Sequence, residues 1–128
     1  MEKLTTPATN KGAADWFTGD VFVDPIAQGQ GDSPMSVASV HFCPCGHTAW
    51  HRHTIGQTLY VTEGVGYVQG RGGPLLTIRA GDVIRIAAGE EHWHGAAPDH
   101  FMTHLAITEG DTQWGEHLTD DEYPTAAA

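Results

Sequence analysis

Residues 50–57 read Trp-His-Arg-His-Thr-Ile-Gly-Gln, and two histidines one residue apart stand near the start of this segment. Successive side chains on a β-strand point to opposite faces, so His51 and His53 would share one face, about 6–7 Å apart along the strand. Two imidazoles at that spacing can bind one metal ion. A second pair with the same spacing, His92 and His94, follows a turn. Ordinary surface or core histidines explain one such pair, whereas two pairs on short strands favour a metal site.

Short runs of β-branched and aromatic residues, separated by glycine, extend the strand pattern along the chain. Sixteen glycines are about twice the average share for a chain of this length. The predicted strands are Asp20–Val23, Met35–Phe42, Thr48–His53, Gln57–Thr62, Gly66–Gln69, Leu75–Arg79, Val83–Ile86, His92–Gly95 and Met102–Ile107. Only Trp114–Tyr123 suggests a helical turn or two. Regular spacing of short strands predicts an antiparallel sandwich or barrel.

Length and charge limit the classes of protein that fit. A chain of 128 residues predicts one domain, which we place at residues 13–123, with tails at 1–12 and 124–128. Six basic against sixteen acidic residues give a net charge of −10, which argues against binding nucleic acid or an anionic membrane. The sequence shows neither a membrane-length apolar run nor a signal peptide, so we expect a cytoplasmic location. Cys43 and Cys45 are expected at a strand end and turn, not in a disulfide or zinc site.

Two spaced motifs resemble those of the cupin family. The first is Gly46-x4-His51-x-His53-x3-Gln57-x6-Gly64, and the second is Gly81-x5-Ala87-x-Gly89-x2-His92-x3-Ala96. The chain departs from the usual pattern in the spacing of the first glycine and in Gln57, Ala87 and Ala96, which replace Glu, Pro and Asn. The resemblance implies an all-β cupin jelly-roll barrel in a single domain. It also implies that the metal ligands are His51, His53, Gln57 and His92.

A narrower resemblance extends over almost the whole chain. Its segments are 12–19, 48–51, 56–59, 92–98, 102–107 and 116–120, and they are similar to small bacterial manganese-dependent cupins that act as (R)-selective hydroxynitrile lyases. The resemblance implies manganese as cofactor, Gln57 as a genuine fourth ligand and His104 as the acid–base residue. It also places Ala38 and Val40 in the substrate pocket. The resemblance also favours a homodimer or a larger homo-oligomer, and so does the need to cover exposed sheet edges.

The expected ligand set has a consequence for the chemistry of the ion. Three neutral imidazoles and one amide oxygen leave the +2 charge uncompensated, which favours Lewis-acid over redox chemistry. Manganese, iron, cobalt, nickel and zinc would all accept such ligands. Strand alternation adds His94, which shares a face with His92, as a second candidate for proton transfer. Alternation also predicts an apolar pocket lined by Ala38, Val40, Leu59, Val61 and Ile86.

The function expected from the resemblance and this chemistry is reversible cleavage of a mandelonitrile-like cyanohydrin into an aldehyde and hydrogen cyanide. An oxygen-using cupin dioxygenase, or a related hydrolase or isomerase with incidental lyase activity, is the main alternative, because many activities share one scaffold. A non-catalytic ligand sensor is the other. The remaining aromatics, Trp50, Trp93, Phe42 and Tyr60, are expected in the core or at a subunit interface. The remaining histidines, His41, His47, His100 and His117, are expected at the surface or in structural roles.

Overall fold

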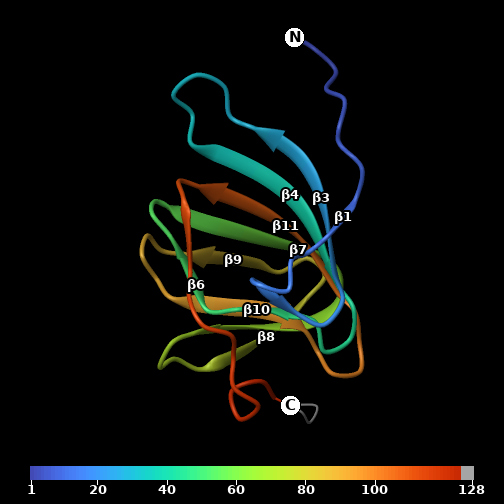
Figure 1. The fold of residues 1–128 in the computed structure, drawn as a ribbon, viewed down its shortest axis with the longest axis vertical. Helices are drawn as coiled ribbons and strands as arrows, with labels where there is room; N and C mark the ends of the chain where they lie inside the picture. The colour runs from blue at the N-terminus through green and yellow to red at the C-terminus, as the bar shows by residue number, and fades with distance from the viewer. Residues whose placement is uncertain (125–128) are drawn as a thin grey trace.

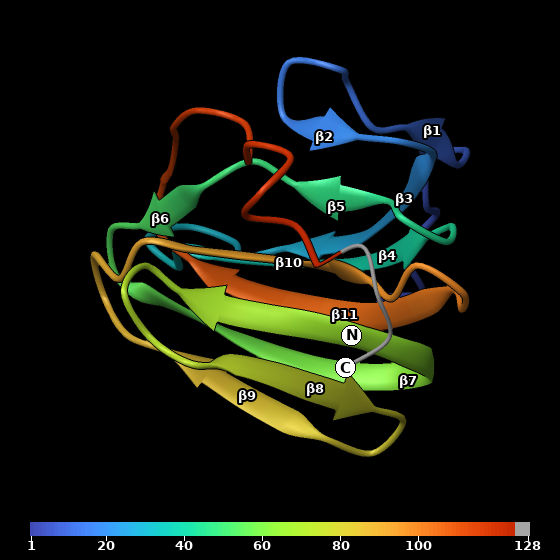
Figure 2. The same cartoon turned by 90° about the horizontal axis from the view of Figure 1, so that it is seen from below.

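The computed structural model describes residues 1–124, and in this range it contains twelve β-strands and no helix. Figures 1 and 2 show the strands curling around the interior into an incomplete barrel. The strands are β1 (Asn10–Lys11), β2 (Phe17–Thr18), β3 (Val21–Gln28), β4 (Met35–Phe42), β5 (His47–Thr48), β6 (His51–His53), β7 (Gly56–Gly70), β8 (Leu75–Arg79), β9 (Val83–Ile86), β10 (His92–Ala96), β11 (Met102–Glu109) and β12 (Thr112–Trp114). The predicted all-β cupin fold is therefore confirmed.

All strand pairs are antiparallel, and the main path through the sheet runs β1-β3-β4-β11-β7-β10-β5-β2. The long strand β7 joins the two halves of the barrel. Its first part pairs with β9 and β11, and its second part pairs with β8 and β10. Gly64 lies between the two parts with a φ of +81°, and a Cβ at this position would collide with the Phe101 carbonyl. Glycine is required there, and it lets one continuous strand change partners.

The predicted strand ranges agree with the structure where the apolar runs are isolated by turns. Met35–Phe42, Leu75–Arg79 and Val83–Ile86 have the predicted bounds. Gln57–Thr62 and Gly66–Gln69 instead belong to the single strand β7, because Gly64 bends the chain without breaking its pairing.

The predicted strand Asp20–Val23 covers only the start of the longer strand β3, and two other segments are divided differently from the prediction. The predicted strand Thr48–His53 is divided into β5 and β6, which pair with different stretches of β10. The helical turns expected within Trp114–Tyr123 reduce to one turn at Thr119, whose carbonyl accepts hydrogen bonds from the amides of Glu122 and Tyr123. The start of that segment belongs to β12, because Trp114 pairs with His51 across the sheet.

The two segments expected to be tails, 1–12 and 124–128, can be compared with the structure in part. Strand β1 lies within the expected tail 1–12 and pairs with β3. Of the expected tail 124–128, only Pro124 lies within the described residues. Within residues 1–124 we find no helix with the length and hydropathy needed to cross a membrane.

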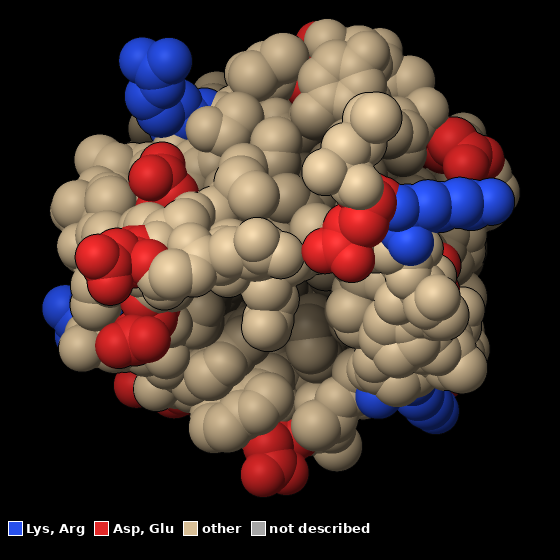
Figure 3. All heavy atoms as spheres, turned by 90° about the horizontal axis from the view of Figure 1, so that it is seen from above, with Lys and Arg blue, Asp and Glu red and all other residues tan. Residues whose placement is uncertain are grey.

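Two hydrophobic clusters form the core of the protein. One contains Val21, Val40, Phe42, Val61, Val68, Ile78, Ala96 and Met102, and the other contains Trp50, Tyr67, Trp93, Ala97 and Tyr123. Phe42, Trp50 and Trp93 are thus core residues, one of the two locations expected for them. Tyr60 is 43% exposed and lies opposite Val83 of β9. On the face seen in Figure 3, charged side chains lie scattered around a central hollow walled mainly by uncharged atoms.

Candidate metal centre

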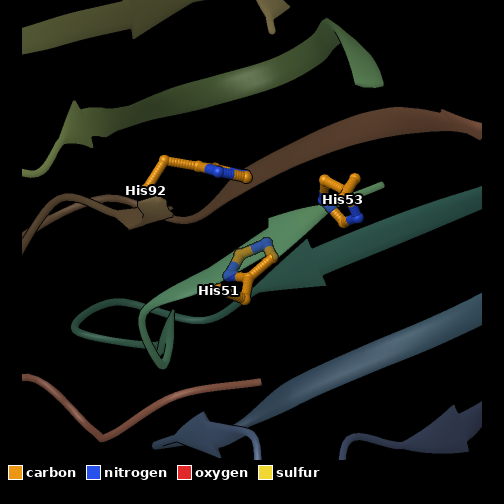
Figure 4. A group of neighbouring side chains, drawn as sticks. All are labelled: His51, His53 and His92. Atoms are coloured by element: carbon orange, nitrogen blue, oxygen red, sulfur yellow. The ribbon is translucent and has the colours of Figure 1, made fainter. Parts of the chain in front are cut away.

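His51, His53 and His92 converge inside the barrel. The first two lie on β6, and His92 lies directly opposite His51 on the neighbouring strand β10. The candidate ligand atoms of the three residues lie within 4.8 Å of one another, and all three side chains are buried. Figure 4 shows the imidazoles extending from the two strands into the same space. The alternation predicted for His51 and His53 brings them together, and the antiparallel pairing of β6 with β10 adds His92. We call these three residues the histidine cluster.

Each imidazole of the histidine cluster is held through its Nδ1 atom. The partners are the carbonyl of Ala49 for His51 (2.9 Å), the hydroxyl of Thr112 for His53 (3.0 Å) and the carbonyl of Glu90 for His92 (2.8 Å). A backbone carbonyl only accepts hydrogen bonds, so Nδ1 of His51 and of His92 carries the proton and Nε2 keeps its lone pair. Nε2 of His53 is buried and forms no hydrogen bond. Such imidazoles are oriented for binding a metal ion through Nε2.

Gln57 supplies an oxygen to the same space from β7. Its Oε1 lies 3.3 Å from Nε2 of His92, and its Nε2 donates a hydrogen bond to the Thr108 hydroxyl (2.9 Å). The side chain is only 7% exposed. The four residues expected as ligands therefore meet in one place, with three nitrogens and one amide oxygen facing inward.

The electrostatics of this place suit a cation. Burial lowers the pKa of His53, lowers that of His51 further, and lowers that of His92 to about 4. All three rings are then neutral near pH 7, which is the form that binds a metal. No carboxylate joins the histidine cluster within the described residues. Three neutral imidazoles and a neutral amide fit a divalent first-row metal ion, and they would leave its +2 charge uncompensated.

A second pair of histidines lies beside the histidine cluster. Nε2 of His104 lies 2.9 Å from Nδ1 of His94, a hydrogen-bonding distance. The His94 ring is 5.2 Å from the His51 ring and 4.7 Å from the His104 ring, so His94 stands between His104 and the histidine cluster. Nε2 of His94 is buried and forms no hydrogen bond. We call His94 and His104 the histidine pair.

Burial of the histidine pair predicts acid instability of the metal-free protein. Desolvation lowers the pKa of His104 from 6.5 to about 4 in the folded state. Between these values the unfolded chain binds a proton that the folded chain does not, so stability is complete above pH 6.5 and falls as the pH drops toward 4. One histidine contributes a slope of at most about 1.4 kcal/mol per pH unit. Urea unfolding of metal-free wild type and His104→Asn should therefore show a smaller pH slope for the variant.

The control for this prediction is Thr58→Val, which removes no titratable group and should keep the wild-type slope. A wild-type slope in His104→Asn would show that His104 takes up its proton equally in both states, contrary to the prediction.

One cavity of about 140 Å³ contains most of these groups. Its walls are Phe17, Val23, Val40, Thr48, His51, His53, Gln57, His94, His104, Ala106, Thr108, Thr112 and Trp114. The histidine pair and three of the four expected ligands therefore face the same space. His41, His47, His100 and His117 are absent from the walls; His47 instead stacks on Tyr123.

The apolar walls of this cavity differ from those predicted by alternation. Val40 lines it, but Leu59 and Val61 are fully buried outside it, and Ile86 borders a separate cavity of about 90 Å³. Ala38 lines a larger groove near the N-terminal segment. Alternation shows which face of a strand a residue occupies, but it does not show the depth at which the residue lies along the barrel.

Aromatic side chains form a wall that the sequence analysis missed. Trp114 of β12 packs against the His51 imidazole with ring centres 4.6 Å apart, and Phe17 of β2 meets Trp114 at 5.8 Å. Trp16 stacks on the outer side of Trp114 at 5.2 Å. These residues come from the two ends of the chain, so no local pattern could have linked them to the central motif. Ala106 could have been found, because it shares a strand face with His104.

The larger groove, with a volume of about 520 Å³, lacks the residue types expected of a catalytic or metal site. It lies between the N-terminal segment and the strands β3 and β4, and its lining includes Leu4, Pro7, Pro25, Ile26 and Ala38. None of its lining residues is a titratable group. The titratable side chains are instead gathered around the smaller cavity.

The protein is therefore a small all-β barrel with a candidate metal centre, formed by histidines that face inward from neighbouring strands. Residues 38–108 match the family described as the cupin domain. The chain belongs to the cupin family. The two motifs that carried the resemblance, from Gly46 to Ala96, lie inside the matched region.

Individual relatives agree with this assignment. The chain is 47% identical to an (R)-mandelonitrile lyase from Granulicella tundricola over 96% of this chain and 97% of that protein. A cupin-like protein from Thermotoga maritima has a structure similar to this one, with a TM-score of 0.85, 40% identity and coverage of 88% of this chain and 89% of that one. The polyketide cyclase RemF from Streptomyces resistomycificus shares the fold at 20% identity, with a TM-score of 0.68 and coverage of 96% and 90%.

Proposed function

We propose that this cupin is a metal-dependent hydroxynitrile lyase that reversibly cleaves a mandelonitrile-like cyanohydrin into an aldehyde and hydrogen cyanide, with preference for the (R) enantiomer. The observation that carries the proposal is the arrangement of three imidazoles and an amide beside the histidine pair, all of them buried and five of the six side chains lining one small cavity. The 47% identity to a lyase with this activity supports the reaction type.

The reaction needs one proton to move and one bond to break. The hydroxyl of the cyanohydrin loses its proton, the C–CN bond breaks with its electron pair leaving on cyanide, and cyanide takes up a proton. A divalent ion held by His51, His53, Gln57 and His92 would supply a Lewis acid for the substrate oxygen. The reaction is redox-neutral, which suits a ligand set without negative charge.

The histidine pair is placed to move this proton. When Nδ1–H of His94 donates to Nε2 of His104, Nε2 of His94 has a free lone pair and accepts the hydroxyl proton. The His104 ring then stabilises the cationic His94 through the shared hydrogen bond. Nε2 of His94 returns the same proton to cyanide, so the histidine pair ends the cycle unchanged. In this scheme His94 is the residue that touches the substrate, and His104 acts through it.

The remaining walls of the cavity bind the organic part of the substrate. Phe17 and Trp114 offer aromatic surfaces, and Val23, Val40 and Ala106 offer aliphatic ones. An aryl group packed there would exclude water and gain from ring–ring contact. We propose manganese as the ion, on the strength of the resemblance; the donor set would also accept iron, cobalt, nickel or zinc. The homodimer and the cytoplasmic location stay predictions.

The proposal predicts equimolar release of benzaldehyde and hydrogen cyanide from (R)-mandelonitrile by the manganese-loaded protein, with slower release from the (S) enantiomer. The measurement is ultraviolet absorbance for the aldehyde and a colorimetric assay for cyanide. Full turnover without oxygen would exclude the alternative of a cupin dioxygenase. Oxygen uptake by the iron-loaded protein together with no aldehyde release would contradict the proposal.

A further inference from the structure

Two threonines lie directly opposite two of the four candidate ligands. In the antiparallel pairing of β11 with β7, Thr108 is the partner of Gln57, and in the pairing of β12 with β6, Thr112 is the partner of His53. Side chains directly opposite each other on one face have Cβ atoms about 4.5–5.5 Å apart, which is close enough for a hydrogen bond. Both threonines also line the cavity.

Thr108 holds the NH₂ end of the Gln57 amide on the side away from the histidine cluster. The amide has an oxygen that can bind a cation and an NH₂ group that cannot. The NH₂ group donates to the Thr108 hydroxyl at 2.9 Å, so the oxygen points toward His92. Both side chains are buried, so an NH₂ group without a partner would be unfavourable there. Without the hydroxyl, the reversed amide would aim its NH₂ group at the ion.

Thr112 performs a similar task for His53. Its hydroxyl lies 3.0 Å from Nδ1 of His53, whereas the other two imidazoles of the histidine cluster are held by backbone carbonyls. A carbonyl is part of the main chain and cannot be removed by substitution. Thr112 is therefore the position at which the orientation of a cluster imidazole depends on a replaceable side chain.

We propose that Thr108 and Thr112 are positioning residues that orient Gln57 and His53 for binding a divalent cation. The inference rests on the metal-binding part of the proposed function. Partners of this kind typically change metal affinity by about 10–100-fold when they are removed. The connection between β11 and β12 is short, at Gly110–Asp111, so one short stretch of chain carries both hydroxyls, each in register with its ligand on β7 or β6.

The test compares valine and serine at each threonine, because valine keeps the shape and removes the hydroxyl, whereas serine keeps the hydroxyl. Metal-free proteins are titrated with Mn²⁺, and free ion is measured by its electron paramagnetic resonance signal. We expect about tenfold weaker binding in Thr108→Val and in Thr112→Val, and recovery of most of the affinity in Thr108→Ser and Thr112→Ser. The visible spectrum of bound Co²⁺ should change in the valine variants, because the donor set or its geometry changes.

The matched control is Thr58→Val, next to Gln57 on β7 but on the opposite face of the strand. It should bind Mn²⁺ like the wild type. A double variant tests whether Thr108 acts through the amide: with Gln57→Ala already present, Thr108→Val should cause no further loss.

Two failures can be told apart. If wild-type protein bound neither Mn²⁺ nor Co²⁺, the metal site of the proposed function would be wrong, and the inference would fall with it. If the wild type bound Mn²⁺ and both valine variants bound it equally well with the same Co²⁺ spectrum, the inference alone would be overturned. Circular dichroism of every variant checks that the fold is kept.

Discussion

His92→Ala is expected to reduce cyanohydrin cleavage by roughly 10³-fold or more, together with loss of the bound metal. The imidazole of His92 lies between its strand partner His51 and the oxygen of Gln57, so its removal opens the centre of the donor set. A Lewis-acid metal contributes several kcal/mol of transition-state stabilisation. Since 1.36 kcal/mol corresponds to a factor of ten, its loss removes about three orders of magnitude. The measurements are elemental analysis and benzaldehyde release from the same preparations.

Chelation provides a second route to the same state. Wild-type protein treated with a chelator should lose its activity and regain it when Mn²⁺ is added, whereas His92→Ala should stay inactive after the same addition. His117→Ala is the matched control, because it removes an exposed histidine that does not line the cavity. Undiminished turnover by metal-free wild type would show that the reaction does not depend on a metal.

Replacing His104 by asparagine is expected to lower turnover by about 10²–10⁴-fold while the metal content stays at the wild-type level. A positioned acid–base group typically contributes this much to the rate, and in the proposed scheme His94 acts as that group only with the support of His104. His104 contacts His94 and not the candidate ligands, so the metal site should remain intact. The measurement is the turnover number at saturating mandelonitrile, with metal content determined on the same sample.

The double variant His94→Asn/His104→Asn tests whether the two rings form one relay. Residues that act as a unit have strongly non-additive effects, so the double variant should lose about as much activity as either single variant. Full activity of His104→Asn with its metal retained would exclude the relay. Independent losses that multiply would mean that the two histidines act in separate steps.

The sequence predicted the fold because its evidence is local. Glycines end the short apolar runs, and alternation along each run sets the inner and outer faces. Strands isolated by turns, such as β4 and β9, were therefore predicted with the observed bounds. Where a glycine bends a strand without ending it, as Gly64 does in β7, local reasoning divided one strand into two.

The site was predictable where a motif carries it. The spacing of His51 and His53 showed that they share a face, and the resemblance joined Gln57, His92 and His104 to them. Alternation also selected His94, which the structure places against His104. The walls of the cavity were not predictable in the same way, because Leu59 and Val61 share the face of Gln57 and yet lie outside the cavity.

By itself the sequence determined which residue types can bind a cation and which faces of the strands they occupy, since both follow from chemistry and spacing within a few residues. Only the tertiary structure decided what lies opposite each of them. Antiparallel register sets Thr108 against Gln57, Thr112 against His53 and Trp114 against His51. These partners are about 50 or more positions apart in the chain, and pairing at that distance depends on the closure of the whole barrel.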